Sequence, residues 1–375
     1  MLAKRIRRAI TIFGLLLICV PTVIAHPPWG IVVSSTGTVY FSDLETVWKI
    51  DREGNVSVFR AGVGGRHVHE LAIDENDNVY GPDYSYEAAN DKFLLGVWEM
   101  TPNGKETYLQ RPIDSSMSGV SVCRDRAGNM YSIEQNNHTK VRTLLLRRTP
   151  AGVVSTIAGG AYGHADGKGT NAKFSSVTAM TFGPDGSIYM TDGTGVRRVT
   201  LDGEVRTIAT DLTTRTAEDK PTLFGGNDKS LFGLSVDTGG SVYVADSGNR
   251  RLVKVSQSGK VSVVYRVDPP YFPTGVFATP NGDVYVLEFS YTPPGTTDKP
   301  RVQKISADGQ NRILTPSPVL RTGVVIAPPI RVIRSGLQSI LAPVNTRFVY
   351  FVLLVMAAVI VLTILFRRQS RKRRT

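Results

Sequence analysis

Gly163-His-Ala-Asp-Gly-Lys-Gly-Thr-Asn-Ala-Lys-Phe174 opens the unit of sequence that decides the fold. After an apolar segment the unit continues with Gly183-Pro-Asp-Gly-Ser-Ile-Tyr-Met-Thr-Asp192, and it closes with Val196-Arg-Arg-Val-Thr-Leu-Asp-Gly-Glu-Val-Arg-Thr-Ile-Ala209. In both Gly183–Asp192 and Val196–Ala209, a turn that contains Gly lies next to a segment with β-branched residues. This pattern is typical of an antiparallel hairpin, so the unit predicts two successive hairpins.

The first hairpin recurs six times along the chain. A tyrosine marks its second strand in each copy: Tyr40, Tyr80, Tyr131, Tyr189, Tyr243 and Tyr285, spaced 40 to 58 residues apart. A second hairpin follows every copy, and four strands at this period are the signature of a propeller blade. The sequence therefore predicts an all-β, six-bladed β-propeller of four-stranded antiparallel blades over residues 26–316. A long β-sandwich or β-helix is the alternative, which six matched pairs of hairpins disfavour.

The two ends of the chain read as targeting and anchoring segments. Residues 1–25 combine a basic start with an apolar run and Val23-Ile-Ala25, which predicts a cleaved signal peptide; an uncleaved anchor is the alternative. Residues 348–366 carry no charge and, as a helix, would span about 28 Å, which predicts one transmembrane helix. The basic tail 367–375 is expected to be cytoplasmic. Residues 317–347 are read as a Pro-containing stalk; the alternative is that Val324–Ile333 adds a closing strand to a blade.

The net charge of +12 comes mostly from these ends. Without the basic residues of the first eight positions and of the tail, 34 basic residues face 32 acidic ones. The remaining body is nearly neutral, so its charge gives no support for nucleic-acid binding. The expected location is the membrane, with a single pass and the propeller extracytoplasmic.

The unit at residues 163–211 resembles an NHL repeat, and the six units resemble six-bladed NHL propellers. That group is similar in fold to the gluconolactonase and senescence-marker-protein family and to the amidating lyases. The resemblance implies the fold but little about function, because this fold hosts both binding and catalysis. The gluconolactonase group holds one metal with a Glu, two Asn and an Asp, and only Glu70 can be matched here, by type and approximate place. The amidating lyases use His residues from separate blades, for which no matching set is found.

Long connections are expected on one face of the propeller, because both kinds of hairpin turn are short. The variable connections are Pro82–Phe93, Ile133–Arg142, Gly159–Ser176, Asp211–Ser230 and Glu288–Arg301. Long loops on one face of a rigid scaffold indicate the binding side. Tyr84, Tyr86, His138 and His164 are candidate binding residues there, and Trp29, Tyr162 and Tyr271 are aromatic neighbours that suit either recognition or packing.

Residues shared by every blade are read as structural. An acid ends the second strand of each blade: Asp43, Asp83, Glu134, Asp192, Asp246 and Glu288. Each is expected to organise its own blade, as Asp246 would with Asn249 and Arg250. The position ten residues before each tyrosine holds a small residue in five blades (Gly30, Ser121, Ala179, Gly233 and Gly275), as crowding near the axis requires.

Glu70 is the exception at that position, and His67 and His69 lie beside it. These three are candidate channel residues, and Glu70 and His69 are candidate ligands of a divalent cation, Ca²⁺ or Zn²⁺, or an acid and base. The alternative is that they pair with neighbouring polar groups. Two functions stay open: a recognition module for a protein, peptide or glycan, or a metal-dependent hydrolase, lactonase or lyase at Glu70.

Overall fold

The computed structural model describes residues 27–87, 92–114, 121–135, 140–219, 230–290 and 300–315, and leaves the side chains of Tyr86 and Lys92 undescribed. The chain divides into two compact units, Met1–Leu320 and Arg321–Thr375, and all described residues belong to the first. The predicted signal peptide, stalk, transmembrane helix and tail lie outside the described residues, as does His138. Within the described ranges no helix has the length and apolar character needed to cross a membrane.

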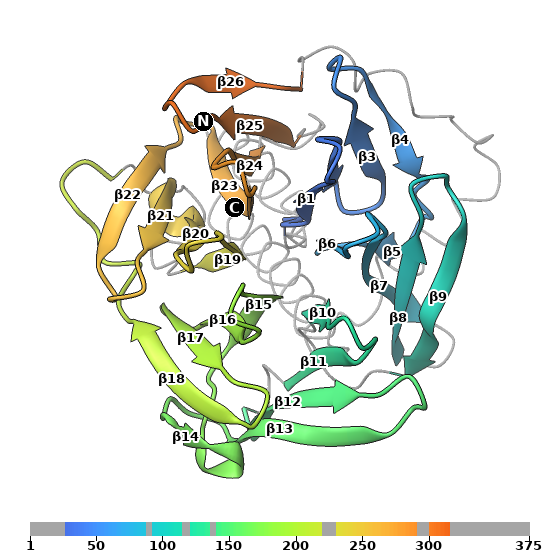
Figure 1. The fold of residues 1–375 in the computed structure, drawn as a ribbon, viewed down its shortest axis with the longest axis vertical. Helices are drawn as coiled ribbons and strands as arrows, with labels where there is room; N and C mark the ends of the chain where they lie inside the picture. Colours follow the sequence, from blue (N-terminus) through green and yellow to red (C-terminus); the bar gives the residue numbers. More distant parts are fainter. Residues whose placement is uncertain are drawn as a thin grey trace, which may run out of the picture. The chain divides into compact units, whose positions relative to one another are not determined.

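Six antiparallel sheets surround a central axis, which confirms the predicted six-bladed propeller (Figure 1). Blade 1 contains β1 (Ile31–Val33), β2 (Val39–Ser42), β3 (Val47–Ile50) and β4 (Val56–Arg60). Blade 2 contains β5 (Arg66–His67), β6 (Ala72–Ile73), β7 (Val79–Glu87), β8 (Lys92–Met100) and β9 (Glu106–Asp114). Blade 3 contains β10 (Val122–Arg124), β11 (Met130–Gln135), β12 (Arg142–Arg148) and β13 (Val154–Ala161).

Blade 4 contains β14 (Gly167–Lys168), β15 (Val177–Phe182), β16 (Ile188–Asp192), β17 (Gly195–Val199) and β18 (Glu204–Ala209). Blade 5 contains β19 (Leu231–Val236), β20 (Val242–Asp246), β21 (Arg251–Val255) and β22 (Val261–Arg266). Blade 6 contains β23 (Tyr271–Ala278), β24 (Val284–Ser290), β25 (Arg301–Ile305) and β26 (Asn311–Ile313). Two 3₁₀ turns, η1 (Gly169–Asn171) and η2 (Ser247–Asn249), complete the described elements.

Blades 1 and 6 meet at the seam of the ring. Among the described strands, every blade is built from strands that follow one another in the sequence, and none of them is shared between the first blade and the last. Ile31 and Phe41 of blade 1 instead pack with Leu287 and Val302 of blade 6 in one buried apolar cluster. The hydrophobic effect of this side-chain packing therefore holds the seam together.

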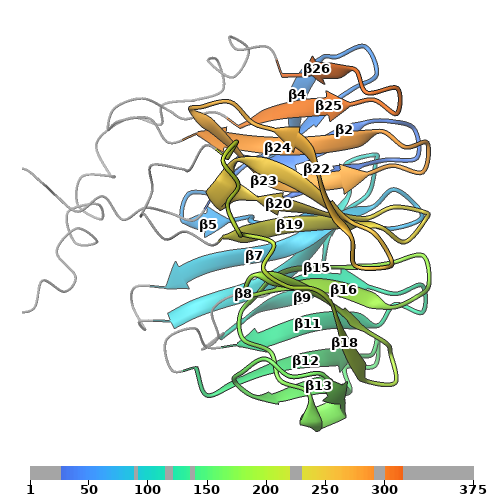
Figure 2. The same ribbon diagram turned by 90° about the vertical axis from the view of Figure 1, so that its left-hand side faces the viewer.

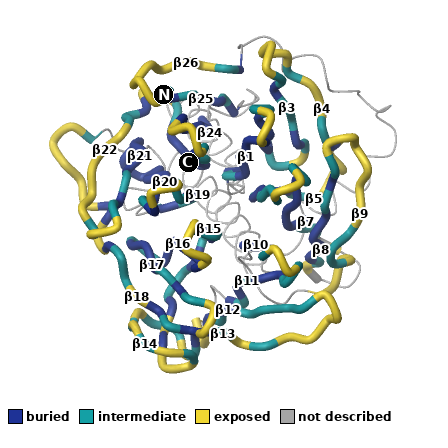
Figure 3. Tube along the Cα trace, viewed as in Figure 1, coloured by how far each residue is buried: buried dark blue, intermediate teal, exposed yellow. Residues whose placement is uncertain are grey.

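The core follows the inner and middle strands of the blades. Figure 3 shows these strands largely buried, whereas the outer strands β9, β22 and β26 are exposed along most of their length. The inner strands approach one another so closely that small residues are required. A Cβ added to Gly275 would lie 2.3 Å from the carbonyl oxygen of Trp29, which confirms the predicted crowding near the axis.

The inner strand of blade 2 is interrupted at the residues that the sequence analysis singled out. β5 and β6 both pair with β7, and Val68–Leu71 lie between them. Opposite this gap stand Gly81 and Pro82, and Pro82 has no backbone N–H to donate to a ladder. The Glu70 carbonyl approaches so closely that a Cβ on Gly81 would lie 2.4 Å from its oxygen. The interruption lets Glu70 leave the regular path of the strand.

Two of the predicted connections differ from the expected loops. β7 and β8 run through most of the 82–93 stretch as a hairpin that extends past the neighbouring strands, at the end opposite the tight turns (Figure 2). In the 159–176 stretch, β14 pairs with β18 and so lies at the outer edge of blade 4. Gly167 and Gly169, both with positive φ, allow this segment to turn back along the edge.

Candidate functional site

Five rings from three blades meet at the end of the channel where the inner strands begin. We call Trp29, His67, His69, Tyr84 and Phe232 the mouth cluster. Its ring centroids lie 5.1 Å apart for Trp29 and His69, 5.7 Å for Trp29 and Phe232, 5.8 Å for His67 and His69, and 5.7 Å for His69 and Tyr84. The backbone N–H of Trp29 also donates to the carbonyl of His69 at 2.8 Å, which joins blades 1 and 2.

The mouth cluster unites several predicted residues and adds one that was missed. His67, His69, Tyr84 and Trp29 were candidates from the sequence, whereas Phe232 was not. A signal was present, because Trp29, His69 and Phe232 each directly precede the residue that stands ten positions before the blade tyrosine. Comparing this one position across the six repeats would have found the three rings together.

Glu70 lies next to the mouth cluster and connects three blades. Its side chain is buried, and Ser121 Oγ donates to Oε1 at 2.7 Å while the Val122 N–H donates to Oε2 at 3.1 Å. The Met180 N–H in turn donates to Ser121 Oγ at 2.8 Å. Blade 2 is thereby tied to β10 of blade 3 and β15 of blade 4, so Glu70 does pair with neighbouring polar groups.

Burial raises the pKa of Glu70 to about 8, because the apolar surroundings disfavour a charge. The donors from Ser121 and Val122 act in the opposite direction without cancelling this effect. The Trp29 indole weakly favours the ionised form as well, although its buried Nε1 makes no hydrogen bond of normal geometry. At neutral pH the carboxyl is therefore mostly protonated.

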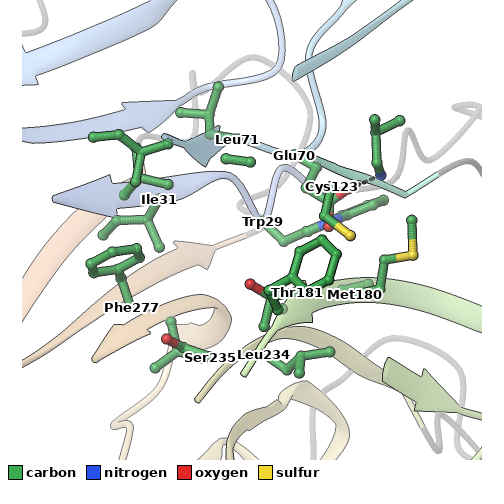
Figure 4. A pocket seen from close by; sticks show the side chains of 18 of the residues that line it. Trp29, Ile31, Glu70, Leu71, Cys123, Met180, Thr181, Leu234, Ser235 and Phe277 are labelled. Carbon is green, nitrogen blue, oxygen red and sulfur yellow. Dashed lines mark hydrogen bonds between the residues drawn. The ribbon is translucent and has the colours of Figure 1, made fainter. Parts of the chain in front are cut away.

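A partly enclosed cavity of about 190 Å³ extends from Glu70 and Trp29 along the axis. Residues of all six inner strands line it, and Figure 4 shows side chains such as Leu71, Met180, Leu234 and Phe277 around it. Ile73, Arg124, Phe182 and Phe277 of its wall lie at or near the ends of β6, β10, β15 and β23, just before the tight turns. The cavity thus extends away from the mouth cluster toward the turn side.

The geometry does not favour a metal at Glu70 and His69. Among the residues that the structure describes, no three His, Cys, Asp or Glu side chains are grouped so that they could hold a metal ion. Both Glu70 oxygens already accept hydrogen bonds from the protein, and the carboxyl is mostly neutral at pH 7. Metal binding by Glu70 and His69 stays a prediction, and a neutral hydrogen-bonding carboxyl accounts better for the observed contacts.

His164 lies apart from the mouth cluster, within the ion-pair network of blade 4. Its Nδ1 is 3.4 Å from Asp192 Oδ2 and 3.4 Å from Arg197 Nη1. Two other predicted aromatic residues have separate partners, since Lys140 lies over the Tyr162 ring and Arg301 over the Tyr271 ring. His138 and the side chain of Tyr86 lie outside the described part, so these two candidates stay untested.

The acids that end the second strands have structural partners, as expected. Asp83 pairs with Arg60 of the neighbouring blade at 2.9 Å, and Glu134 pairs with Arg142 at 2.5 Å. Asp246 accepts from Asn249 Nδ2 and from Arg251 Nε, each at 2.8 Å. The predicted partner Arg250 was wrong: its backbone is left-handed and its Nη1 donates to the carbonyls of Pro270 and Tyr271 instead.

The sequence matches no protein-family model and no curated protein. Solved structures are similar in fold. Virginiamycin B lyase from Staphylococcus aureus is 16% identical with a TM-score of 0.44, covering 76% of this chain and 83% of that one. A putative gluconolactonase is 15% identical with a TM-score of 0.46, covering 69% and 84%. A calcium-binding regucalcin from Agrobacterium tumefaciens is 14% identical with a TM-score of 0.46, covering 70% and 81%.

These neighbours are propeller enzymes or binding proteins. Identities this low carry no statement about the activity of this chain, because one fold hosts many functions. The argument about function therefore depends on the site itself.

Proposed function

We propose that this chain is a membrane-anchored, extracytoplasmic propeller with NHL-like repeats, which recognises a protein or peptide segment at its mouth cluster. The observation that carries the proposal is that Trp29, His69 and Phe232 occupy one repeat position in three blades and meet at one end of the channel. Aromatic side chains gathered at one site are typical of binding hot spots. Glycan and enzymatic alternatives are less well supported.

The stacking of the rings favours a peptide over a sugar. Trp29 packs against both His69 and Phe232, and His69 also contacts Tyr84, so these rings are engaged with one another. A sugar is usually held on an open ring face, whereas an aliphatic or aromatic side chain can fit against ring edges. The extended β7–β8 hairpin beside the cluster, which carries Tyr84, adds a wall on which a peptide backbone could lie (Figure 2).

Photocrosslinking tests the binding site in cells that express the full-length chain. A benzophenone amino acid at Tyr84 is expected to crosslink one polypeptide, and His67→Ala is expected to reduce that adduct at least tenfold. The matched control is the same benzophenone at Asn103, an exposed residue in the turn between β8 and β9. A crosslink at Asn103 but none at Tyr84 would place recognition on the turn side, and an adduct sensitive to glycosidases but not to proteases would indicate a glycan.

Removal of residues 348–366 and the tail tests the anchoring. The shortened chain is expected to move from the membrane fraction to the soluble extracytoplasmic fraction, because the apolar segment supplies the membrane affinity. A tag at the C-terminus of the full chain should be protected from externally added protease, whereas the propeller should be reachable. A full chain that is released by alkaline carbonate would contradict a spanning anchor.

A further inference from the structure

We propose that the cavity on the turn side of Glu70 binds an organic ammonium ion with a compact apolar body, and that Glu70 is its counter-ion. This site is distinct from the recognition surface at the mouth cluster. Trp29 belongs to both, but His67, His69, Tyr84 and Phe232 do not line the cavity. The cavity continues from Trp29 toward the tight turns, at the opposite end of the inner strands.

Several apolar side chains line the cavity and can contact an apolar body. They include Ile31, Leu71, Met180, Leu234 and Phe277 (Figure 4). A cavity of about 150 Å³ accommodates a benzene ring, so about 190 Å³ has room for a six-membered ring and one further group. Burying such a body contributes about 25 cal/mol for each Å² of apolar surface.

Among the described residues that line the cavity, Glu70 is the one acid. The residue is 6% exposed, and none of the described Lys, Arg or His side chains forms an ion pair with it. Arg124 also lines the cavity, but its guanidinium is already paired with Asp74 at 2.6 Å and Glu99 at 2.8 Å. When ionised, the Glu70 carboxylate would therefore lack the cationic partner that buried carboxylates normally have.

An ammonium group would complete the hydrogen bonding of this carboxyl. The protein uses one acceptor site on each oxygen, for Ser121 and Val122, whereas an ionised carboxylate offers about four such sites. An ammonium has three donors and no acceptor, so it can occupy the remaining sites and supply the missing charge. On binding, a protonated carboxyl would release its proton to solvent, and the ion pair would replace it.

The two forms of Glu70 distinguish a cation from a neutral ligand. An ammonium stabilises the ionised carboxylate through an ion pair, whereas a neutral isostere can only accept a hydrogen bond from the protonated carboxyl. The chemistry at this end of the cavity therefore selects a cation over an isosteric neutral compound.

Titration of the full-length chain with cyclohexylammonium tests the proposal. Calorimetry at pH 7.5 is expected to show saturable binding at one site, with cyclohexanol at least tenfold weaker. Glu70→Gln is expected to weaken cyclohexylammonium binding at least tenfold and to leave cyclohexanol unchanged. The matched control is Glu53→Gln, which removes an exposed acid from a turn on the same side of the propeller.

A second measurement keeps the test decisive if the Glu70 variant folds poorly. With methyl-labelled methionine, cyclohexylammonium should shift the Met180 signal of the unaltered chain, whereas Met130 and Met190, which do not line the cavity, should stay in place. Equal shifts with cyclohexanol, or no Met180 shift at saturating amine, would overturn the proposal. So would full binding by Glu70→Gln, and none of these results depends on the mouth cluster.

Discussion

Replacing Arg197 by methionine is expected to destabilise the propeller by about 3–5 kcal/mol, because it removes one partner of a buried ion pair. Arg197 is fully buried, and its guanidinium donates to Asp192 Oδ2 and to Asp166 Oδ1, each at 2.8 Å. It also donates to the carbonyl of Ala165 at 2.8 Å. The variant would leave Asp192 buried without its cation and would release the 163–174 segment from blade 4.

The neighbouring residue provides the control for this prediction. Arg198 lies on the same strand but pairs with the partly exposed Asp185, so Arg198→Met should cost no more than about 1 kcal/mol. Guanidinium-induced unfolding of both variants, followed by tryptophan fluorescence, gives the two free energies. Equal losses would mean that the buried network adds nothing beyond an ordinary surface pair.

The second large expected effect is that Glu70→Gln removes the contribution of Glu70 to the pH dependence of stability. The folded pKa of Glu70, about 8, lies above its ordinary value of 4.5, so the folded state binds more protons between these values. The contribution is complete below pH 4.5 and is lost as the pH rises to about 8. At about 1.4 kcal/mol per pH unit, the loss for this one group is at most about 5 kcal/mol.

Glutamine is a close match for the protonated acid at this place. Its amide oxygen can accept from the Val122 N–H, and its amide N–H can donate to Ser121 Oγ, which has a second lone pair besides the one facing Met180. The free energy of unfolding of the Glu70→Gln variant should therefore about equal that of the unaltered chain at pH 4.5, and should exceed it by a few kcal/mol at pH 9.

Other groups near Glu70 do not confuse this comparison. Burial raises the pKa of the Cys123 thiol, so it stays neutral in this range, and Arg124 is paired with Asp74 and Glu99. Denaturation at several pH values measures the difference between the two proteins, so groups common to both cancel. A difference that does not change between pH 5 and pH 9 would show that Glu70 is not held neutral.

Local chemistry made the hairpins predictable. The turns depend on residues a few positions apart, as where the Asp51 side chain accepts from the Asn55 N–H at 2.7 Å, and such patterns are visible in the sequence. Glu70 was found because it breaks a repeat. Its partners Ser121, Val122 and Met180 come from two other blades, and only the closed ring brings them within reach.

The misplacement of the 159–176 stretch comes from longer-range contacts. The 159–176 stretch was expected over the loop face, but pairing of β14 with β18 holds it at the edge. Arg197 donates to Ala165 and Asp166 and so fixes the segment there. Arg197 lies 31 residues after Asp166, so no short-range sequence pattern predicts this contact. Phe232 was missed for a different reason: it lies one residue before the small repeat position, so the pattern at that position does not mark it.

The seam between blades 1 and 6 has a consequence for the cost of making the ring. Within each blade, strands pair with partners nearby in the chain, so each pairing closes only a short loop and loses little chain entropy. Bringing Ile31 to Leu287 closes a much longer loop, but the cost of closure grows only with the logarithm of length. Relative to closing a single blade, the extra cost is about 1.5 kcal/mol, which the burial of one large apolar side chain offsets. The packing of side chains at the seam therefore offsets the entropic cost of closing the ring.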